Sequence, residues 1–369
     1  MTSMPRKALG LAVAIGLIAM ACSSTSSSPS SAAMTPLKFQ LQWVPQAQFA
    51  GYYAAQDQGY FKDAGLDVTF VPGGPNVDNI QAVAAGNADI GTGWLPKMLQ
   101  SRENGTDLVS IAQVFQRSGT RMVSFKDKAI TDPKAFAGKK IGSWLGGNEP
   151  ELFAAMTKVG LDPATQNVIQ QNFDMSGLLN GDLDVAQAMI YNEYAQVLEA
   201  TNPATGKQYT PDDLNVIDFN DPSVATAMLQ DQIFASDKWL KTGDNAKIAQ
   251  KFLEASFKGW AYCRDNAQKC VDLVLKAGSQ LGASHQAWQM NEINGLIWPS
   301  PNGVGIMDKT LWDQTINIAT TYKVLKGAPS DGAYRTDLAQ AALDAIGSSA
   351  DTKGTNFQKG TVTLNAGGN

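Results

Sequence analysis

The residues between Leu41 and Phe61 combine aromatic rings with carboxamides and contain no lysine or arginine. Phe49, Tyr52 and Tyr53 recur at three- and four-residue spacing, which places their rings on one face of a helix. Aromatic faces stack on flat groups, and amides hydrogen-bond to polar edges. The segment therefore predicts a binding surface for a flat, neutral ligand, with packing of the same rings in a core as the competing interpretation.

Further candidates for this site follow strand-like segments in the first part of the chain. The turn Pro72–Asn76 joins a strand to a helix, and its glycines would let backbone amides approach a ligand closely, although an ordinary tight turn would look the same. Trp94 follows a strand in the same way. The ligand-binding candidates in this part are Trp43, Gln46, Gln48, Phe49, Tyr53, Gly73, Asn76 and Trp94.

A second group of candidates, in the middle of the chain, is Trp144, Tyr191, Asn192 and Glu193. We expect Glu193 to accept hydrogen bonds from ring N–H groups of the ligand; the alternative is a solvated residue in a first helical turn. Trp144 precedes a glycine-rich turn, and Glu149 and Glu151 come after this turn. Carboxylates at a helix start favour the helix dipole but repel an anion, which argues against a phosphorylated or sulfonated ligand.

The sequence holds no arrangement of residues typical of catalysis. His285 is the only histidine, so a Ser-His-Asp or Cys-His site would have to use it, and its place in a helical run with Trp288 and Met290 favours a structural role. A zinc site, a P-loop and a dinucleotide fingerprint are not expected. The prediction is a protein without catalytic residues, cofactor or metal.

The elements that would position these residues alternate between strand and helix. The strand-like segments are Leu37–Trp43, Asp67–Val71, Ala88–Gly91, Leu108–Phe115, Lys140–Gly142, Val168–Asn172, Val185–Met189, Leu214–Asp218 and Gln232–Ser236. Helical segments separate them, and from about Asp237 the pattern is almost entirely helical. Such alternation predicts an α/β fold with parallel sheets, and ligands bind such sheets at the carboxyl ends of the strands.

About 335 residues follow the amino-terminal region, too many for one ordinary core, so two lobes are expected. We assign lobe I to 37–122 and 233–346, lobe II to 123–232, and a poorly packed tail to 347–369. The crossovers near Arg121–Ser124 and Gln230–Phe234 should act as hinges. The net charge of -5 and pI near 5.0 argue against nucleic acid as a partner.

The amino terminus predicts export. Arg6 and Lys7 precede the apolar run Ala8–Met20, which is too short for a permanent membrane helix and reads as a signal peptide over residues 1–21. Ile18–Cys22 resembles a bacterial lipobox, so Cys22 is expected to be acylated, and residues 22–36 form a flexible tether. We therefore expect an extracytoplasmic protein anchored to the cell membrane by lipid.

Cys263 and Cys270 are the only other cysteines. In one unbroken helix they would lie about 10.5 Å apart by rise alone, beyond the roughly 4.4–6.8 Å that a disulfide spans between α-carbons. A bridge therefore requires a turn between them, for which Asp265 or Asn266 could cap a new helix. We expect the disulfide; two buried thiols are the alternative.

Taken in order, five motifs resemble the solute-binding proteins of ABC importers in the alkanesulfonate and thiamine-pyrimidine family. They are QWVPQAQFAGYYAAQDQGYFKDAGLDV, AAGNADIGTGW, AMIYNEY, DQIFASDKWL and NEINGLIWPSPNGVGIMD. The resemblance runs from about Leu37 to Leu343 and implies a bilobal type II periplasmic-binding-protein fold. The pyrimidine-binding branch typically has a W-x-P-N-x-x-H turn, in which this chain has Gln46 and Phe49. The variant is similar to the riboflavin-binding branch.

This resemblance implies a monomeric binding protein. It would capture riboflavin or a related flat heterocycle between its lobes and deliver it to a membrane permease driven by ATPase subunits. One alternative is a binder of a thiamine pyrimidine precursor or of an aliphatic sulfonate, which would need a cation in its site. Another is an exported enzyme or sensor that reuses the fold. The fungal enzymes of the family need a cysteine-rich motif and the histidine of the turn, so an enzyme is not expected.

Overall fold

The computed structural model describes residues 33–369, of which 34–369 form one compact unit. The expected signal peptide, the acylated Cys22 and most of the tether lie outside the described residues. Among residues 33–369, no helix has the length and apolar character needed to cross a membrane.

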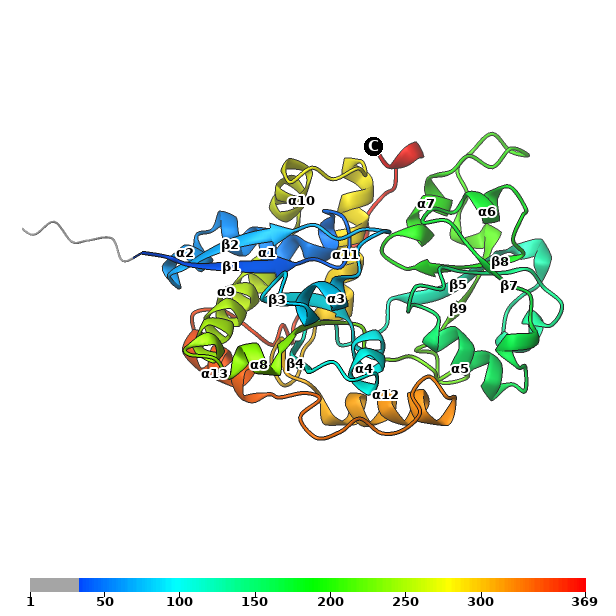
Figure 1. Cartoon of the computed structure of the whole chain (residues 1–369). Coiled ribbons are helices and arrows are strands. Elements are labelled where there is room, and N and C mark those ends of the chain that lie inside the picture. The colour runs from blue at the N-terminus through cyan, green and yellow to red at the C-terminus, as the bar shows by residue number, and fades with distance from the viewer. Residues whose placement is uncertain (1–32) are drawn as a thin grey trace, which may run out of the picture. The chain divides into compact units, whose positions relative to one another are not determined.

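The first of two five-stranded sheets has the strand order β2-β1-β3-β10-β4 (Figure 1). Its strands are β1 (Thr35–Gln40), β2 (Leu66–Val71), β3 (Ile90–Trp94), β4 (Leu108–Gln113) and β10 (Asp231–Ser236). β1 pairs in parallel with β2 and β3, whereas β10 runs antiparallel between β3 and β4. We call this sheet and the helices packed on it the first lobe.

The second sheet repeats this plan with the order β7-β6-β8-β5-β9. Its strands are β5 (Thr120–Phe125), β6 (Ile141–Ser143), β7 (Val168–Gln170), β8 (Val185–Met189) and β9 (Leu214–Asp218). β6 pairs in parallel with β7 and β8, and β5 runs antiparallel between β8 and β9. This sheet and its helices are the second lobe.

Strand β5 is the one strand that the sequence pattern does not predict. Its polar residues Arg121 and Ser124 interrupt the apolar run, yet Met122 and Val123 are fully buried. The guanidinium of Arg121 pairs with Asp218 of the edge strand β9 at 2.8 Å, so the charge is compensated within the sheet. The expected hinge at Arg121–Ser124 is thus part of a strand, and the segments that pass between the sheets are 114–119 and 219–230.

Thirteen α-helices occur among the described residues, the longest of them in the carboxyl-terminal part. They are α1 (Ala50–Asp57), α2 (Tyr60–Asp63), α3 (Asn79–Ala84), α4 (Leu95–Glu103), α5 (Pro150–Lys158), α6 (Ser176–Leu179), α7 (Glu193–Glu199), α8 (Asp237–Leu240), α9 (Asn245–Asp265), α10 (Ala267–Lys276), α11 (Ala283–Ile297), α12 (Lys309–Thr321) and α13 (Asp337–Ile346). The helix α9 packs along α1 and α13 in the first lobe (Figure 1).

The expected disulfide between Cys263 and Cys270 is present. Helix α9 ends at Asp265 and α10 begins at Ala267, so the chain turns at Asn266 and brings the two α-carbons to 5.6 Å. Both cysteines are fully buried in the core of the first lobe.

The segment after Ile346 is mostly exposed, as expected for a tail, but several specific contacts hold it. Lys359 pairs with Glu292 of α11 at 2.9 Å, and Gly360 exchanges two hydrogen bonds with Asn291. The side chain of Leu364 packs on the core of the second lobe. Its composition is that of a loop, but backbone and charged groups fix it to α11 and to the second lobe.

The two segments that cross between the lobes meet at one buried carboxylate. Glu151, in the first turn of α5, accepts hydrogen bonds from the backbone N–H of Met228 at 2.6 Å and from the hydroxyl of Ser118 at 3.0 Å. The amide of Gln230 donates to the same side chain at 3.2 Å. Burial raises the pKa of Glu151 to about 7, although these hydrogen bonds oppose the shift.

This shift predicts a pH-dependent stability. The folded protein keeps the Glu151 proton up to about pH 7, whereas the unfolded chain releases it near its ordinary pKa of 4.5. The free energy of unfolding from this group therefore falls as pH rises from about 4.5 to 7 and is constant above. Relative to Glu151→Gln, we expect the wild type to lose about 2–3 kcal/mol between pH 5 and 8 in urea titrations. The exposed Asp127→Asn is the control, and parallel profiles for wild type and Glu151→Gln would contradict the prediction.

Candidate functional site

A cleft between the two lobes is lined by loops that follow the parallel strands of both sheets. The cavity between its walls has a volume of about 150 Å³. The first-lobe lining, after β1, β2 and β3, is Gln42, Trp43, Gln46, Gln48, Gly74, Pro75, Val77, Asn79, Trp94 and Lys97. The second-lobe lining, after β6, β7 and β8, is Trp144, Gly146, Gly147, Asn148, Phe173, Met189, Tyr191, Asn192 and Glu193.

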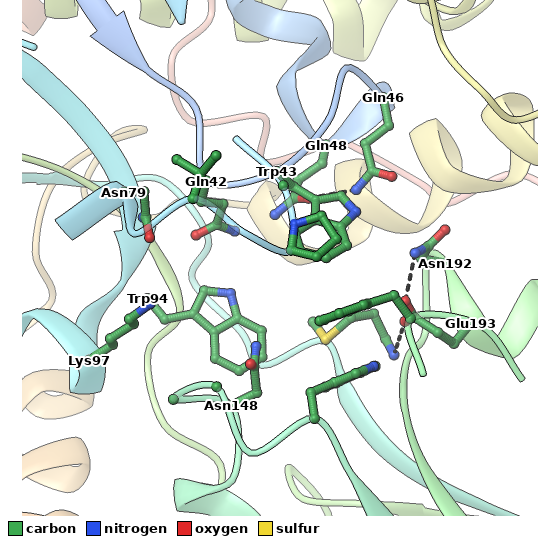
Figure 2. Close-up of a pocket in the computed structure, with 18 of the residues that line it drawn as sticks. Gln42, Trp43, Gln46, Gln48, Asn79, Trp94, Lys97, Asn148, Asn192 and Glu193 are labelled. Carbon is green, nitrogen blue, oxygen red and sulfur yellow. Dashed lines mark hydrogen bonds between the residues drawn. The ribbon is translucent and has the colours of Figure 1, made fainter. Parts of the chain in front are cut away.

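Eight of the twelve residues predicted to bind a ligand line this cleft. They are Trp43, Gln46, Gln48, Trp94, Trp144, Tyr191, Asn192 and Glu193. They come together because the strands that precede them are parallel neighbours in their sheets, so that their carboxyl ends open at the same edge. Figure 2 shows Trp43, Gln46 and Gln48 facing Asn192 and Glu193 across the cleft.

The other four predicted residues do not line the cleft. Phe49 is 1% exposed and belongs to the core of the first lobe. Tyr53 is half-buried and packs edge-on against Phe70, with ring centroids 5.1 Å apart. Phe49 directly precedes α1, and Tyr53 contacts β2 through Phe70, so the core interpretation holds for these two rings.

The turn after β2 contributes residues other than those predicted. Gly73 lies behind the wall: its N–H donates to the carbonyl of Trp43 at 3.0 Å, and an added Cβ would lie 2.4 Å from the carbonyl oxygen of Leu41. Glycine is therefore required at this position because the chain packs closely there, and not because it contacts a ligand. Asn76 is exposed and lies outside the cleft. Asn79, at the start of α3, lines the cleft instead.

Aromatic rings cover much of the cleft surface. Trp94 and Trp144 are 8% and 4% exposed, so each presents little more than one edge or face to the cavity. Trp43 is half-buried and touches Phe173 of the opposite lobe, with centroids 4.9 Å apart and the rings tilted by 50°. Phe173 was not predicted, because it lies alone in a polar loop after β7. Trp43 and Phe173 together form a contact between the lobes at the cleft.

Behind the first-lobe wall, amides are ordered by a buried carboxylate. Gln42 and Gln48 each donate a hydrogen bond of 2.7 Å to Oδ1 of Asp231, at the start of β10. Gln46 in turn donates to Oε1 of Gln48 at 2.7 Å. The oxygen Oε1 of Gln46 is buried and has no partner among the described residues. This chain of hydrogen bonds thus leaves Oε1 of Gln46 as an unpaired acceptor at the wall, suited to an N–H or O–H group of a ligand.

Asp231, which orders these wall amides, is a residue that the sequence reasoning missed. Burial raises its pKa to about 6, opposed by hydrogen bonds from Gln48 and Gln42. Its only sequence signal is a carboxylate that opens a strongly apolar strand, which here places the side chain at the end of the sheet beneath the cleft.

The second-lobe wall carries another buried carboxylate. Glu193 is 4% exposed, which contradicts the interpretation as a solvated first-turn residue. Its Oε2 accepts from the backbone N–H of Met189 at 2.9 Å, and its Oε1 accepts from Nδ2 of Asn192 at 2.7 Å. Burial raises the pKa of Glu193, opposed by these hydrogen bonds. That Glu193 accepts hydrogen bonds from ligand N–H groups stays a prediction. Each of its carboxylate oxygens still has a lone pair for such a bond.

Lys97 of α4 places a cation in the cleft wall, where the sequence reasoning expected none. Its ammonium lies 3.8 Å from Oδ1 of Asp78, and both side chains are partly exposed, so the charge is only weakly compensated. The lysine side chain packs beside Gly147 of the second lobe, where an added Cβ would lie 2.9 Å from Cδ of Lys97. Among residues 33–369, no group of three or more His, Cys, Asp or Glu side chains is arranged to hold a metal ion.

Comparison with known proteins gives the following matches. A family model described as "NMT1/THI5 like" matches residues 46–270. The formylaminopyrimidine-binding protein of Halalkalibacterium halodurans is 21% identical over 83% of this chain and 91% of its own length. The riboflavin-binding protein RibY of Chloroflexus aurantiacus is 23% identical over 85% of this chain and 91% of its own.

Among solved structures, the periplasmic aliphatic sulphonate binding protein SsuA of Escherichia coli aligns with a TM-score of 0.59 and 14% identity. The alignment covers 80% of this chain and 89% of SsuA. At this identity the likeness concerns the fold alone. It confirms the expected type II periplasmic-binding-protein fold, with two mixed α/β sheets.

Proposed function

Because the chain belongs to the NMT1/THI5-like family, we propose that it is an extracytoplasmic solute-binding protein that captures riboflavin or a related flat heterocycle. The observation that carries this proposal is the cleft itself, in which Trp43, Trp94 and Trp144 surround a row of amides. Bound solute would be delivered to an ABC importer permease and its ATPase subunits. The ligand would favour closure by the extra contacts it makes when both walls touch it.

The residues of the cleft walls support a ligand with a ring system, because they can stack on its faces and hydrogen-bond to its edges. Indole faces offer stacking worth about 0.5–1.5 kcal/mol per ring beyond area burial, so two or three rings supply a good part of micromolar binding. Oε1 of Gln46 and the indole N–H of Trp144 are an acceptor and a donor that have no partner among the described residues. An isoalloxazine has an edge that carries both donors and acceptors, and Asn79 and Asn148 would serve the hydroxyls of a ribityl chain.

Two other ligand classes compete for the same cleft. A pyrimidine precursor would use the same stacking and edge contacts over a smaller area, and one relative is named for binding such a compound. An aliphatic sulfonate is favoured by one observation, the partly exposed ammonium of Lys97. The carboxylates Asp231 and Glu193 in the same walls would oppose an anion.

A binding role is also proposed in preference to catalysis. The only histidine, His285, is fully buried and does not line the cleft. The carboxylates at the cleft are engaged by amide donors: Asp231 holds Gln42 and Gln48, and Glu193 holds Met189 and Asn192. These hydrogen bonds give both carboxylates a role in ordering the walls of the cleft. The proposed signal peptide and acylation of Cys22 would place this protein at the membrane surface.

Riboflavin titration tests the proposal directly. We expect the purified mature protein to quench flavin fluorescence with micromolar or tighter affinity, because stacked indoles quench the ring, and to show a raised melting temperature in its presence. An aminopyrimidine and an alkanesulfonate are the comparison ligands. If either of these raised the melting temperature while riboflavin neither bound nor was displaced, the assignment of a flavin would be wrong.

A further inference from the structure

A buried carboxylate behind the first-lobe wall determines which atom of the Gln46 amide is left for a ligand. Asp231 is 3% exposed, and its ionised carboxylate can only accept hydrogen bonds. Nε2 of Gln48 therefore faces Asp231, at 2.7 Å. Because the amide of Gln48 is held in this orientation, its Oε1 accepts from Nε2 of Gln46, at 2.7 Å. The free end of this chain is Oε1 of Gln46, an acceptor with no partner among residues 33–369.

The position of this acceptor is fixed as well as its polarity. Helix α11 directs the fully buried side chains of Gln286 and Gln289 at the backbone of the turn that carries Gln46. The N–H of Ala47 donates to Oε1 of Gln286 at 2.7 Å, and the N–H of Gln48 donates to Oε1 of Gln289 at 3.2 Å. An acceptor that is ordered before binding costs little to engage, and it cannot turn to offer an N–H group instead.

The opposite wall presents acceptors to the same part of the cleft. Figure 2 shows Asn192 and Glu193 across the cleft from Gln46. Nδ2 of Asn192 already donates to Oε1 of Glu193 at 2.7 Å, so the carboxylate oxygens are what this wall offers. A ring edge that lies between Gln46 and Glu193 must bring its own N–H group, because an edge with acceptors alone would face oxygen atoms on both sides.

The rim of the cleft has the opposite character. Val77 of the first lobe and Phe173 of the second line it and are 39% and 42% exposed. They belong to the few exposed large apolar side chains among residues 33–369. Gln46 and Glu193, by contrast, are 2% and 4% exposed. The cleft is therefore polar where it is buried and apolar where it opens, which suits a ligand that is inserted polar end first.

We propose that Asp231 determines ligand specificity: through Gln48 it holds Gln46 as an acceptor, so that the cleft selects flat rings whose buried edge carries an N–H group. Asp231 is a positioning residue, since it does not line the cleft. The inference rests on the proposed function and deepens it. An isoalloxazine has an imide N–H on one terminal ring and methyl groups on the other, so the methyl-bearing ring would lie at the rim.

Two derivatives of riboflavin test this orientation. N3-methylriboflavin lacks the imide N–H, whereas roseoflavin keeps it and carries a dimethylamino group in place of a methyl group at the apolar end. By calorimetric titration, we expect roseoflavin to bind within about threefold of riboflavin and N3-methylriboflavin about 30-fold more weakly or worse, because the methyl group leaves a buried acceptor unpaired. All titrations are made at pH 8, where Asp231, whose pKa burial raises to about 6, is ionised. Equal binding of N3-methylriboflavin and riboflavin would overturn the proposal.

Gln48→Met and Asp231→Leu interrupt the chain at different points. Each new side chain is close in size to the one it replaces but cannot pass on the hydrogen bond, so Gln46 is free to turn. Riboflavin affinity should fall about tenfold and N3-methylriboflavin affinity should not, which lowers the discrimination about tenfold. Asp231→Leu also leaves Gln42 without its acceptor, so Gln48→Met decides if Asp231→Leu does not fold. The control Asp313→Asn, which removes an exposed ion pair on α12, should discriminate as the wild type does. Equal losses for both ligands in Gln48→Met would refute the role of Asp231.

Other ligand classes separate this inference from the assignment of a flavin. An aminopyrimidine and its N,N-dimethyl derivative are compared in the same variants. If riboflavin does not bind, while the aminopyrimidine binds and loses its advantage over the dimethyl derivative in Gln48→Met, the flavin fails and the role of Asp231 stands. Binding of an alkanesulfonate alone, which has no N–H group, or of none of these ligands, would overturn both.

Discussion

Replacing Trp43 by alanine is expected to weaken riboflavin binding about 30- to 100-fold, the largest effect of any single ring in the cleft. Trp43 is the most accessible of the three cleft tryptophans and the one that contacts the opposite lobe, through Phe173. The substitution removes a stacking surface and a contact that holds the walls together. Fluorescence titration of both proteins measures the change in affinity.

The stability of the Trp43→Ala variant distinguishes a ligand-binding ring from a core ring. Trp43 is half-buried, so we expect the free energy of unfolding to fall by no more than about 2 kcal/mol. The control is Trp312→Ala, which removes a half-buried ring outside the cleft that lies tilted by 45° against Tyr334, with centroids 4.4 Å apart. That variant should lose comparable stability and no affinity. Global unfolding of Trp43→Ala would instead show that Trp43 is a core residue of the first lobe.

Gly259→Ala is expected to destabilise the protein by about 3 kcal/mol or more. Gly259 lies where α9 crosses α1, and an added Cβ would lie 2.0 Å from the carbonyl oxygen of Gly51 and 2.9 Å from the backbone nitrogen of Ala55. Both are backbone atoms of α1, so the helices themselves would have to separate. Urea unfolding followed by circular dichroism measures the loss.

A matched glycine provides the control for this variant. Gly327 has open space around the position of an added Cβ, and its backbone does not require a glycine. Gly327→Ala should therefore leave stability within about 0.5 kcal/mol of the wild type. A loss below about 1 kcal/mol for Gly259→Ala would show that α1 and α9 can separate easily, which would also loosen the wall that α1 supports.

The sequence by itself located most of the strands and the cleft-lining loops that follow them. Alternating apolar residues and turn signals are local properties, and the loops after parallel strands must meet at one sheet edge. Trp43, Trp144 and Tyr191 could be placed in the cleft for that reason. The disulfide was also predictable, because it required only a turn near Asn266.

Other features were decided by the tertiary structure alone. Which face of α1 is buried depends on the position of the sheet, so Phe49 and Tyr53 could not be separated from the ligand wall by spacing. Strand β5 is stabilised by its neighbours on both sides, not by its own pattern. The pairing of His285 with Glu199 joins residues 86 positions apart in sequence. Local periodicity fixes the elements, whereas contacts between distant residues require the packed fold to bring them together.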